Sequence, residues 1–446
     1  MPGGAILQQR TKNIQFLKEK GKDMKYLVEQ KSSRARHLST SVALSLAISA
    51  LLLATQAKAD TVKIGLLAQL TGSSSADGQE MVKAAQLAID EVNAGGGIEG
   101  HTFELVIGDT RDGASSDVVA AAERVIGDQD VHFVMAAYAS LTSFEIDLMA
   151  EADMPYILSG PSGQTRGIIE KDPEKYWCCW SMTPAFEAYN TDVTRLVDRL
   201  AADKKVTLKD PKKVAIVSSD NAYSSTIYAG MQEEAKSSGW TQTVGEVVPF
   251  GEVNDWGTVL TKVRADAPDL IVNLDYLQAN AALFLNQFLE DPTNSLLFLQ
   301  YSPSVPEFLE ITGEKSEGVI YDLLGGAIQN DKNPRGLEIA KKYQAKYNAE
   351  ISTYGQFGYE MIYIYADALK KVKDYKDHKA IAVAIGATDR NSAQGRLKFD
   401  PKTHLAMQGD DYFPIQFYQI QDGKRVLISP KRYADGEFRM PPWIKQ

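Results

Sequence analysis

Apolar runs with the length of β-strands alternate with longer helical patterns along most of the chain, in two successive series. The first series has strand-like runs at 61–67, 103–107, 131–137 and 155–158, with helical spacing at 78–93, 115–127 and 141–152. The second has strand-like runs at 213–217, 244–248, 270–274, 296–299 and 318–321, with helical spacing at 223–238, 255–265 and 278–289. Strands that are separated by helices pair in parallel. We therefore expect an α/β fold with two mostly parallel sheets flanked by helices.

The C-terminal part departs from this alternation. Two long helical patterns, at 334–348 and 355–373, follow one another directly. Residues 413–430 then read as a β-hairpin that turns at Asp422-Gly423. With 446 residues in all, the chain is long enough for two or three domains at about 100–200 residues each.

The N-terminus has the pattern of a secretory signal peptide. A basic lead precedes the apolar run SVALSLAISALLLA at 41–54, and the small residues Ala57 and Ala59 follow it. The run is shorter than the roughly 20 residues that a transmembrane helix needs, although an N-terminal anchor is the alternative. We expect residues 1–59 to be removed near Ala59, and Met24 is a possible true start that would give a leader of ordinary length.

Charge argues against nucleic acid as a partner. Residues 1–59 carry ten Lys and Arg against three Asp and Glu, and the whole chain has a net charge of −10, so the mature part is at −17. Nucleic-acid binding depends on cations that contact phosphates, which an acidic protein supplies poorly.

The two cysteines are adjacent, at Cys178-Cys179. A trans peptide holds neighbouring Cα atoms about 3.8 Å apart, closer than disulfides prefer. Three states stay open for an exported chain: a vicinal disulfide, two buried thiols, or pairing with another molecule. The five histidines show no ligand spacing with these cysteines, so we expect no metal site.

Catalytic and nucleotide-binding patterns are missing from the sequence. Ser140 follows a predicted strand but lacks the flanking glycines of G-x-S-x-G, and no histidine stands at a convincing triad position. Neither G-x-x-x-x-G-K-[ST] nor a G-x-G-x-x-G after the first strand is present. We expect neither an enzyme nor a bound cofactor; a hydrolase is the remaining alternative of another class.

Two polar loops follow neighbouring strands of the first series, and these are the best candidates for a binding site. They are Ala139-Ser140-Leu141-Thr142-Ser143 and Ser159-Gly160-Pro161-Ser162-Gly163. Ligands of open parallel sheets bind beyond the carboxyl ends of the strands, and helix N-terminal amides with a hydroxyl suit a carboxylate. Simple helix capping is the alternative for each serine.

The second series offers complementary groups at its own strand ends. Asp275 could pair with a ligand ammonium group, or it could cap the helix that begins near Leu277. Tyrosines in this half, with Tyr223 among them, could form the wall around an apolar part of the ligand.

Several segments, in this order, resemble the branched-chain amino acid (Leu/Ile/Val) binding family, which are periplasmic solute-binding proteins of ABC transporters. The segments are VKIGLLAQLTG (62–72), GQEMVKAAQLAIDEVNAGGGIEG (78–100), the Ser140 loop, MPYILSGPS (154–162), VAIVSSDNAYSS (214–225) and QFGYEMIYIYADAL (356–369). The resemblance covers nearly all of residues 61–446. It implies a two-lobed Venus flytrap with three crossover segments, with lobe 1 at 60–183 plus 328–400 and lobe 2 at 184–327 plus 401–446.

The resemblance also implies a function and a set of site residues. We expect a monomeric periplasmic protein that delivers a small carboxylate-bearing solute to an ABC permease in the inner membrane. The resemblance implies that Ala139, Ser140 and Ser162 bind the ligand's carboxylate, and that Tyr223 and Asp275 complete the site from lobe 2. To these we add Ser159 and Gly160 of the second polar loop, and Tyr138 and Tyr301 as candidate walls.

Two small residues depart from the usual amino-acid binders. Ala76 stands where they often carry a bulky side chain, and Ala139 stands where serine is common. We expect a branched-chain or aliphatic amino acid as ligand, with urea or short amides and aromatic carboxylates as alternatives.

Overall fold

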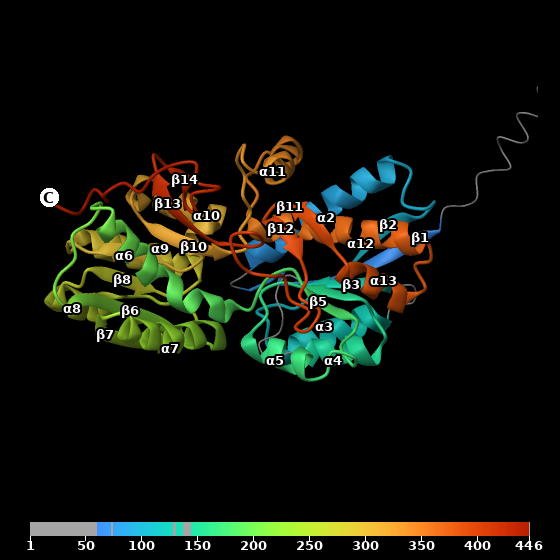
Figure 1. Ribbon diagram of the computed structural model, residues 1–446, viewed down its shortest axis with the longest axis horizontal. Coiled ribbons are helices and arrows are strands. Elements are labelled where there is room, and N and C mark those ends of the chain that lie inside the picture. The colour runs from blue at the N-terminus through green and yellow to red at the C-terminus, as the bar shows by residue number, and fades with distance from the viewer. Residues whose placement is uncertain (1–59, 73–74, 128–130, 137–143, 446) are drawn as a thin grey trace, which may run out of the picture. The chain divides into compact units, whose positions relative to one another are not determined.

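The computed structural model describes residues 60–445 apart from 73–74, 128–130 and 137–143. Residues Thr61–Gln446 form one compact unit that contains two large sheets, each with helices packed on it (Figure 1). Among the described helices, none combines the length and the apolar content needed to cross a bilayer. The apolar run at 41–54 lies outside the described residues.

The first sheet has five parallel strands in the order β2-β1-β3-β4-β5. Its strands are β1 (Thr61–Ala68), β2 (Thr102–Asp109), β3 (Val131–Ala136), β4 (Tyr156–Leu158) and β5 (Cys179–Ser181). The helices between them are α2 (Ser75–Ala94), α3 (Ser115–Gly127), α4 (Phe144–Glu151) and α5 (Gly163–Lys171). We call this sheet, with the helices packed on it, the first lobe.

The second sheet has seven strands in the order β14-β13-β10-β9-β8-β6-β7, and we call it, with its helices, the second lobe. The parallel strands are β6 (Lys212–Asp220), β7 (Trp240–Pro249), β8 (Leu270–Asn273), β9 (Leu296–Leu299) and β10 (Ile320–Leu324). The hairpin β13 (Ile415–Gln421) and β14 (Lys424–Ser429) adds two antiparallel strands at one edge. The helices are α6 (Asp192–Ala202), α7 (Ala222–Ser237), α8 (Gly257–Asp266), α9 (Gln278–Glu290) and α10 (Pro306–Thr312).

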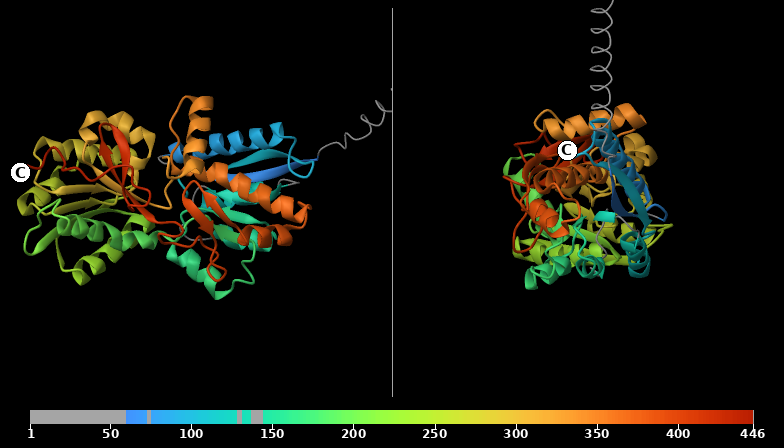
Figure 2. Two further views of the ribbon diagram at one scale, coloured as in Figure 1. Left: turned by 45° about the horizontal axis from the view of Figure 1, so that its top comes forward. Right: turned by 90° about the vertical axis from the view of Figure 1, so that its right-hand side faces the viewer.

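The chain returns to the first lobe after β10. Helices α11 (Pro334–Tyr347), α12 (Thr353–Val372) and α13 (His378–Gly386) share one hydrophobic core with β1, α2 and β3 (Figure 2). Helix α12 is apolar on most of its surface and is buried on most of it, as a central helix must be. Gly358 lets α12 approach α2, because a Cβ atom there would lie 2.6 Å from the Met81 carbonyl oxygen. After the small hairpin β11 (Asp389–Ser392) and β12 (Gly395–Lys398), the chain goes back to the second lobe.

The structure confirms the predicted α/β class with two mostly parallel sheets. It also contains elements that the sequence did not predict, namely α5, β5, α6, α10, α13 and the β11–β12 hairpin. Cys178 and Cys179 are two free cysteines, both buried, so the vicinal disulfide left open by the sequence is not formed in this structure.

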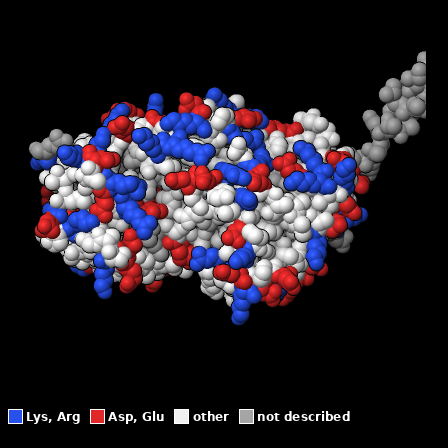
Figure 3. Space-filling model, viewed as in Figure 1, with Lys and Arg blue, Asp and Glu red and all other residues white. Residues whose placement is uncertain are grey.

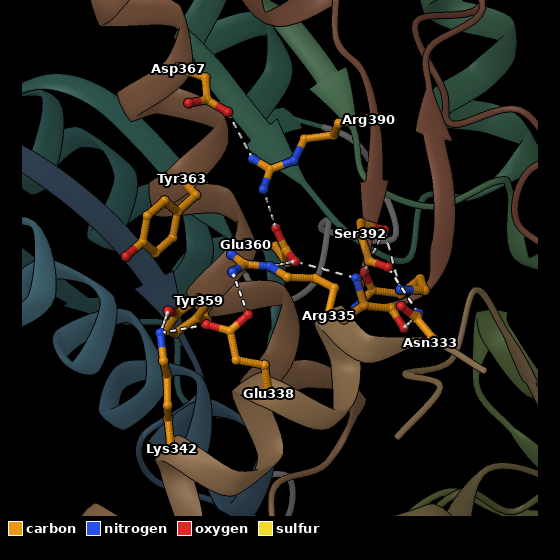
Figure 4. A network of polar contacts seen from close by, with 12 residues as sticks. Asn333, Arg335, Glu338, Lys342, Tyr359, Glu360, Tyr363, Asp367, Arg390 and Ser392 are labelled. Atoms are coloured by element: carbon orange, nitrogen blue, oxygen red, sulfur yellow. Dashed lines mark hydrogen bonds and ion pairs between the residues drawn. The ribbon is translucent and has the colours of Figure 1, made fainter. Parts of the chain in front are cut away.

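A buried carboxylate on α12 connects this helix to α11 and to the β11–β12 hairpin (Figure 4). Glu360 of α12 is fully buried and accepts hydrogen bonds from Arg335 Nε at 2.9 Å and from the Ala393 amide at 3.2 Å. Arg390 approaches the other carboxylate oxygen at 3.3 Å and also contacts Asp367. The network therefore holds α11, α12 and the β11–β12 hairpin to one another.

We expect Glu360→Gln to destabilise the protein by about 1.5–3 kcal/mol, because the variant loses the charge of a fully buried carboxylate that accepts from the partly buried Arg335. Thermal unfolding of the variant measures this as a lower Tm. Glu437→Gln is the control, since Glu437 pairs with Lys205 at the exposed surface, and it should leave the Tm unchanged. Equal Tm values for wild type and Glu360→Gln would contradict the assignment.

Candidate functional site

A cavity of about 130 Å³ lies between the two lobes, and we call it the ligand cavity. Its walls come from segments that follow strands: Gln69 after β1, Gly160 after β4, Tyr276 after β8 and Tyr301 after β9. The other lining residues are Asp112, Gly113, Thr183, Pro184, Phe186, Tyr189, Tyr223, Leu323, Leu324, Thr353, Tyr354 and Phe357. The cavity thus lies at the carboxyl ends of the parallel strands, where crevices in such sheets form.

Aromatic rings dominate the walls of the ligand cavity. Seven of its sixteen lining residues are Phe or Tyr, and the rings support one another. The Tyr223 ring lies 5.1 Å from Phe186 and 5.5 Å from Tyr276, centroid to centroid, in tilted and T-shaped arrangements. Asp112 is the only charged residue among the described residues that line the cavity. The described walls therefore offer ring faces and neutral polar groups rather than a cation.

The predicted site residues divide into three groups. Gly160, Tyr223 and Tyr301 line the ligand cavity. Ser159, Ser162 and Asp275 are buried, and each is within two residues of a lining residue in the sequence, but they do not line the cavity themselves. Tyr138, Ala139 and Ser140 lie outside the described residues.

Ser162 makes the contacts of a helix cap. It precedes α5, and its hydroxyl oxygen accepts from the Thr165 amide at 3.1 Å while the Thr165 hydroxyl accepts from the Ser162 amide. This reciprocal pattern is a capping box. The capping alternative therefore describes the contacts that Ser162 makes in this structure.

Asp275 also has partners within its own lobe. Its two carboxylate oxygens accept from the Leu277 amide at 3.0 Å and from Asn280 Nδ2 at 2.8 Å. Burial raises the pKa of this carboxyl to about 6, and the two hydrogen bonds oppose the rise. The neighbouring Tyr276 lines the ligand cavity instead.

Sequence reasoning did not identify several residues of the cavity. Tyr276 directly follows a predicted site residue, and Tyr354 and Phe357 begin α12, whose motif carried part of the family resemblance. Gln69 follows the first predicted strand, the position that marked the predicted loops, so the same signal could have identified it. Thr183 follows β5, a strand that the sequence did not predict.

A hydrogen bond joins the two lobes at the ligand cavity. The Tyr301 hydroxyl donates to Asp77 Oδ2 at 2.6 Å, and both side chains are buried. Asp77 lies in the first turn of α2, whereas Tyr301 belongs to the core of the second lobe. Tyr301 has a φ of +63°, an unfavourable backbone conformation for a bulky residue. Arg425 of β14 adds a second contact between lobes, an ion pair to Glu350 at 2.7 Å.

Comparisons with known proteins agree on one family. The sequence profile described as "Periplasmic binding protein" matches residues 61–424. Leu/Ile/Val-binding protein homolog 8 of Brucella melitensis is 26% identical over 86% of this chain and 94% of the relative. Homolog 7 from the same organism is 22% identical over 89% of this chain and 98% of the relative.

Solved structures show the same architecture. A Silicibacter pomeroyi protein with a provisional assignment as a branched-chain amino acid ABC transporter is 30% identical, with a TM-score of 0.77 over 86% of this chain and all of that one. A branched-chain amino acid transporter substrate binding protein from Streptococcus pneumoniae, solved with isoleucine, is 23% identical, with a TM-score of 0.68 over 82% and 98% of the two chains. A solute binding protein from R. palustris, solved with benzoate, is 16% identical, with a TM-score of 0.67 over 85% and 99%. At these two lower identities the likeness concerns the fold.

We expect Tyr301→Phe to increase the separation of the lobes in the ligand-free protein. A hydrogen bond to a carboxylate contributes about 1.5–3 kcal/mol, so its loss lowers the ratio of closed to open protein about tenfold or more. Small-angle X-ray scattering measures the change as a larger radius of gyration. Tyr365→Phe is the matched control, because the buried Tyr365 hydroxyl has no hydrogen-bond partner among the described residues. An unchanged radius of gyration in Tyr301→Phe would contradict the interpretation that this bond holds the lobes together.

A second expectation concerns pH. Asp275 holds its proton more tightly in the folded state than in the unfolded state, so its contribution lowers stability as the pH rises from about 4 to about 6. Asp275→Asn should remove that contribution, which amounts to about 2–3 kcal/mol over this window. Chemical denaturation of both proteins between pH 4 and 7 measures the difference. Parallel stability curves for the two would rule out the raised pKa.

Proposed function

Because the chain belongs to the periplasmic binding protein family, we propose that it is the substrate-binding component of an ABC importer and carries a small carboxylate-bearing solute unchanged. The observation that carries this proposal is the ligand cavity, which has walls from both lobes, seven aromatic rings and no Lys or Arg among its described lining residues.

Neutral donors suit the carboxylate end of the solute. The Gly160 amide donates to Thr183 Oγ1 at 2.8 Å. Since the Thr183 oxygen accepts that bond, its own hydroxyl hydrogen is available for donation to a ligand oxygen. Gly160 has a φ of +61°, which its missing side chain permits, so the backbone can turn beside the cavity.

The opposite end of the solute would meet acceptors. Gln69 is buried, lines the cavity, and its Oε1 atom has no hydrogen-bond partner among the described residues. Asp112 lies in the same wall. Together they could accept from an ammonium group, which is one of the two roles that we considered for Asp275. An amino acid is therefore our first candidate ligand.

The aromatic walls favour a second candidate class. Seven rings stack well on a planar apolar group, which an aromatic carboxylate or an aromatic amino acid provides. The R. palustris neighbour, solved with benzoate, has a similar fold. We therefore keep aromatic carboxylates beside aliphatic amino acids as candidates, and place urea and short amides behind both because they leave the rings without a partner.

Export and assembly complete the proposal. The basic lead and the apolar run at 41–54 support cleavage near Ala59 and a periplasmic location. The lobe boundaries that the resemblance implies, 60–183 plus 328–400 and 184–327 plus 401–446, remain part of the proposal. We further propose that the protein acts as a monomer and docks on an inner-membrane permease.

The proposal is tested with the mature chain, residues 60–446, refolded to remove any bound solute. A thermal-shift screen would cover aliphatic and aromatic amino acids, aromatic carboxylates, urea and amides, because a ligand of the native state raises the Tm. We expect a carboxylate-bearing solute to raise it. Isothermal titration of the best solute should then show at least tenfold weaker binding to Tyr223→Ala.

Tyr228→Ala is the control for this variant, since Tyr228 lies on the same helix but does not line the cavity. Equal affinities of the two variants would remove Tyr223 from the site. Turnover of the solute during the titration would show an enzyme instead.

A further inference from the structure

A second and larger cavity lies between the lobes, beside the segment through which the chain returns from β10 to α11. It has a volume of about 570 Å³, and we call it the hinge cavity. Helix α11 and residues 350–353 of the first lobe form one wall, and strands β10, β13 and β14 of the second lobe form the other. Of the lining residues that the structure describes, the hinge cavity shares Leu323 and Thr353 with the ligand cavity.

Part of the hinge cavity is apolar. The rings of Tyr321 and Tyr418 stack with centroids 5.0 Å apart and planes 11° apart. Leu337, Ile351 and Leu427 continue the same lining. Such a surface accepts an apolar body of moderate size.

Most charged groups of the hinge cavity already have partners. Arg425 pairs with Glu350 and donates to the Pro303 carbonyl at 2.6 Å and the Val305 carbonyl at 2.9 Å. Asp435 accepts from the Leu427 amide at 2.7 Å and from Asn330 at 3.3 Å. These groups therefore contribute little unsatisfied charge to the cavity.

Lys341 and Lys424 differ from these paired groups. Both line the hinge cavity, and neither has an ion pair among the described residues. They come from opposite lobes, Lys341 from α11 and Lys424 from β14. Figure 3 shows Lys and Arg side chains gathered over the region where Figure 1 labels α11 and β14. The cavity also contains Ser304, whose buried hydroxyl has no hydrogen-bond partner among the described residues.

We propose that the hinge cavity is a second binding site, which takes an anion with an apolar body. The apolar part would lie against Tyr321 and Tyr418, and the anionic group would lie between Lys341 and Lys424. An anion held by lysines of both lobes contacts them together only at one separation of the lobes, so its binding would favour that separation.

Leu323 and Thr353 line both cavities and therefore connect the proposed site to the ligand cavity. Thr353 begins α12, and its hydroxyl oxygen accepts from the Ala327 amide at 3.1 Å, which joins α12 to the returning segment. An occupant of the hinge cavity therefore contacts a residue of the ligand cavity. If the proposed function holds, the anion and the solute change one another's affinity by the same factor.

The test uses 8-anilinonaphthalene-1-sulfonate, a fluorescent anion with an apolar body, titrated into the mature protein, residues 60–446. We expect saturable binding that weakens at least tenfold in the Lys341→Ala/Lys424→Ala variant. Lys236→Ala/Lys371→Ala is the matched control, because both are exposed helical lysines outside the two cavities, and it should bind the probe as wild type does. Tm values of the variants establish that each is folded.

Tyr223→Ala separates the two cavities, since Tyr223 lines only the ligand cavity. Probe affinity should be unchanged in this variant. Equal probe affinity for wild type and the Lys341→Ala/Lys424→Ala variant overturns the proposal, and so does a loss of probe binding in Tyr223→Ala. Neither result depends on the identity of the transported solute, so failure of this inference is distinguishable from failure of the proposed function.

Discussion

The bond from the Tyr301 hydroxyl to Asp77 links the two lobes, and the ligand cavity depends on that link because its walls come from both. Without closure, the rings of Tyr223 and Tyr276 in the second lobe would have no opposite wall formed by Gln69 and Gly160. Burial of the Asp77 carboxylate costs free energy unless the carboxylate is hydrogen-bonded. The bond from Tyr301 therefore favours the closed arrangement of the lobes over partly open ones. The strained backbone at Tyr301 suits this reading, since strain of this kind is commonly found at functional sites.

The two cavities differ in chemistry although they share Leu323 and Thr353. The ligand cavity has ring faces, neutral donors and one carboxylate among its described walls, which suits a solute that carries its own balanced charges or a flat apolar group. The hinge cavity has two lysines without ion-pair partners in the described part of the chain, which suits an anion. If both proposals hold, the solute and the anion bind in separate spaces of the same protein.

Much of the fold could be predicted from the sequence, because long apolar runs and helical spacing are local signals. Elements with weak local signals were missed: β5 has three residues, and α5 follows Ser162, which the sequence analysis placed among the ligand contacts. The site could be predicted only in part. Strand-end position pointed to Gly160, and the family resemblance with the tyrosines of the second half pointed to Tyr223 and Tyr301. The contribution of Tyr354 and Phe357 depends on α12 returning to the first lobe, a long-range arrangement that no local pattern encodes.

Ser162 and Asp275 were ambiguous for a local reason. A group that caps a helix and a group that binds a ligand occupy the same kind of position in the sequence, directly after a strand and before a helix.

The most direct test of the central claim is to identify what the protein carries. The protein would be purified from its host without refolding and then denatured, and the small molecules that it releases would be analysed by mass spectrometry. The account predicts one carboxylate-bearing solute in about equal amount to the protein, and a much smaller amount from Tyr223→Ala. Release of no such solute, or equal release from the variant, would contradict the claim that the aromatic cavity between the lobes holds it.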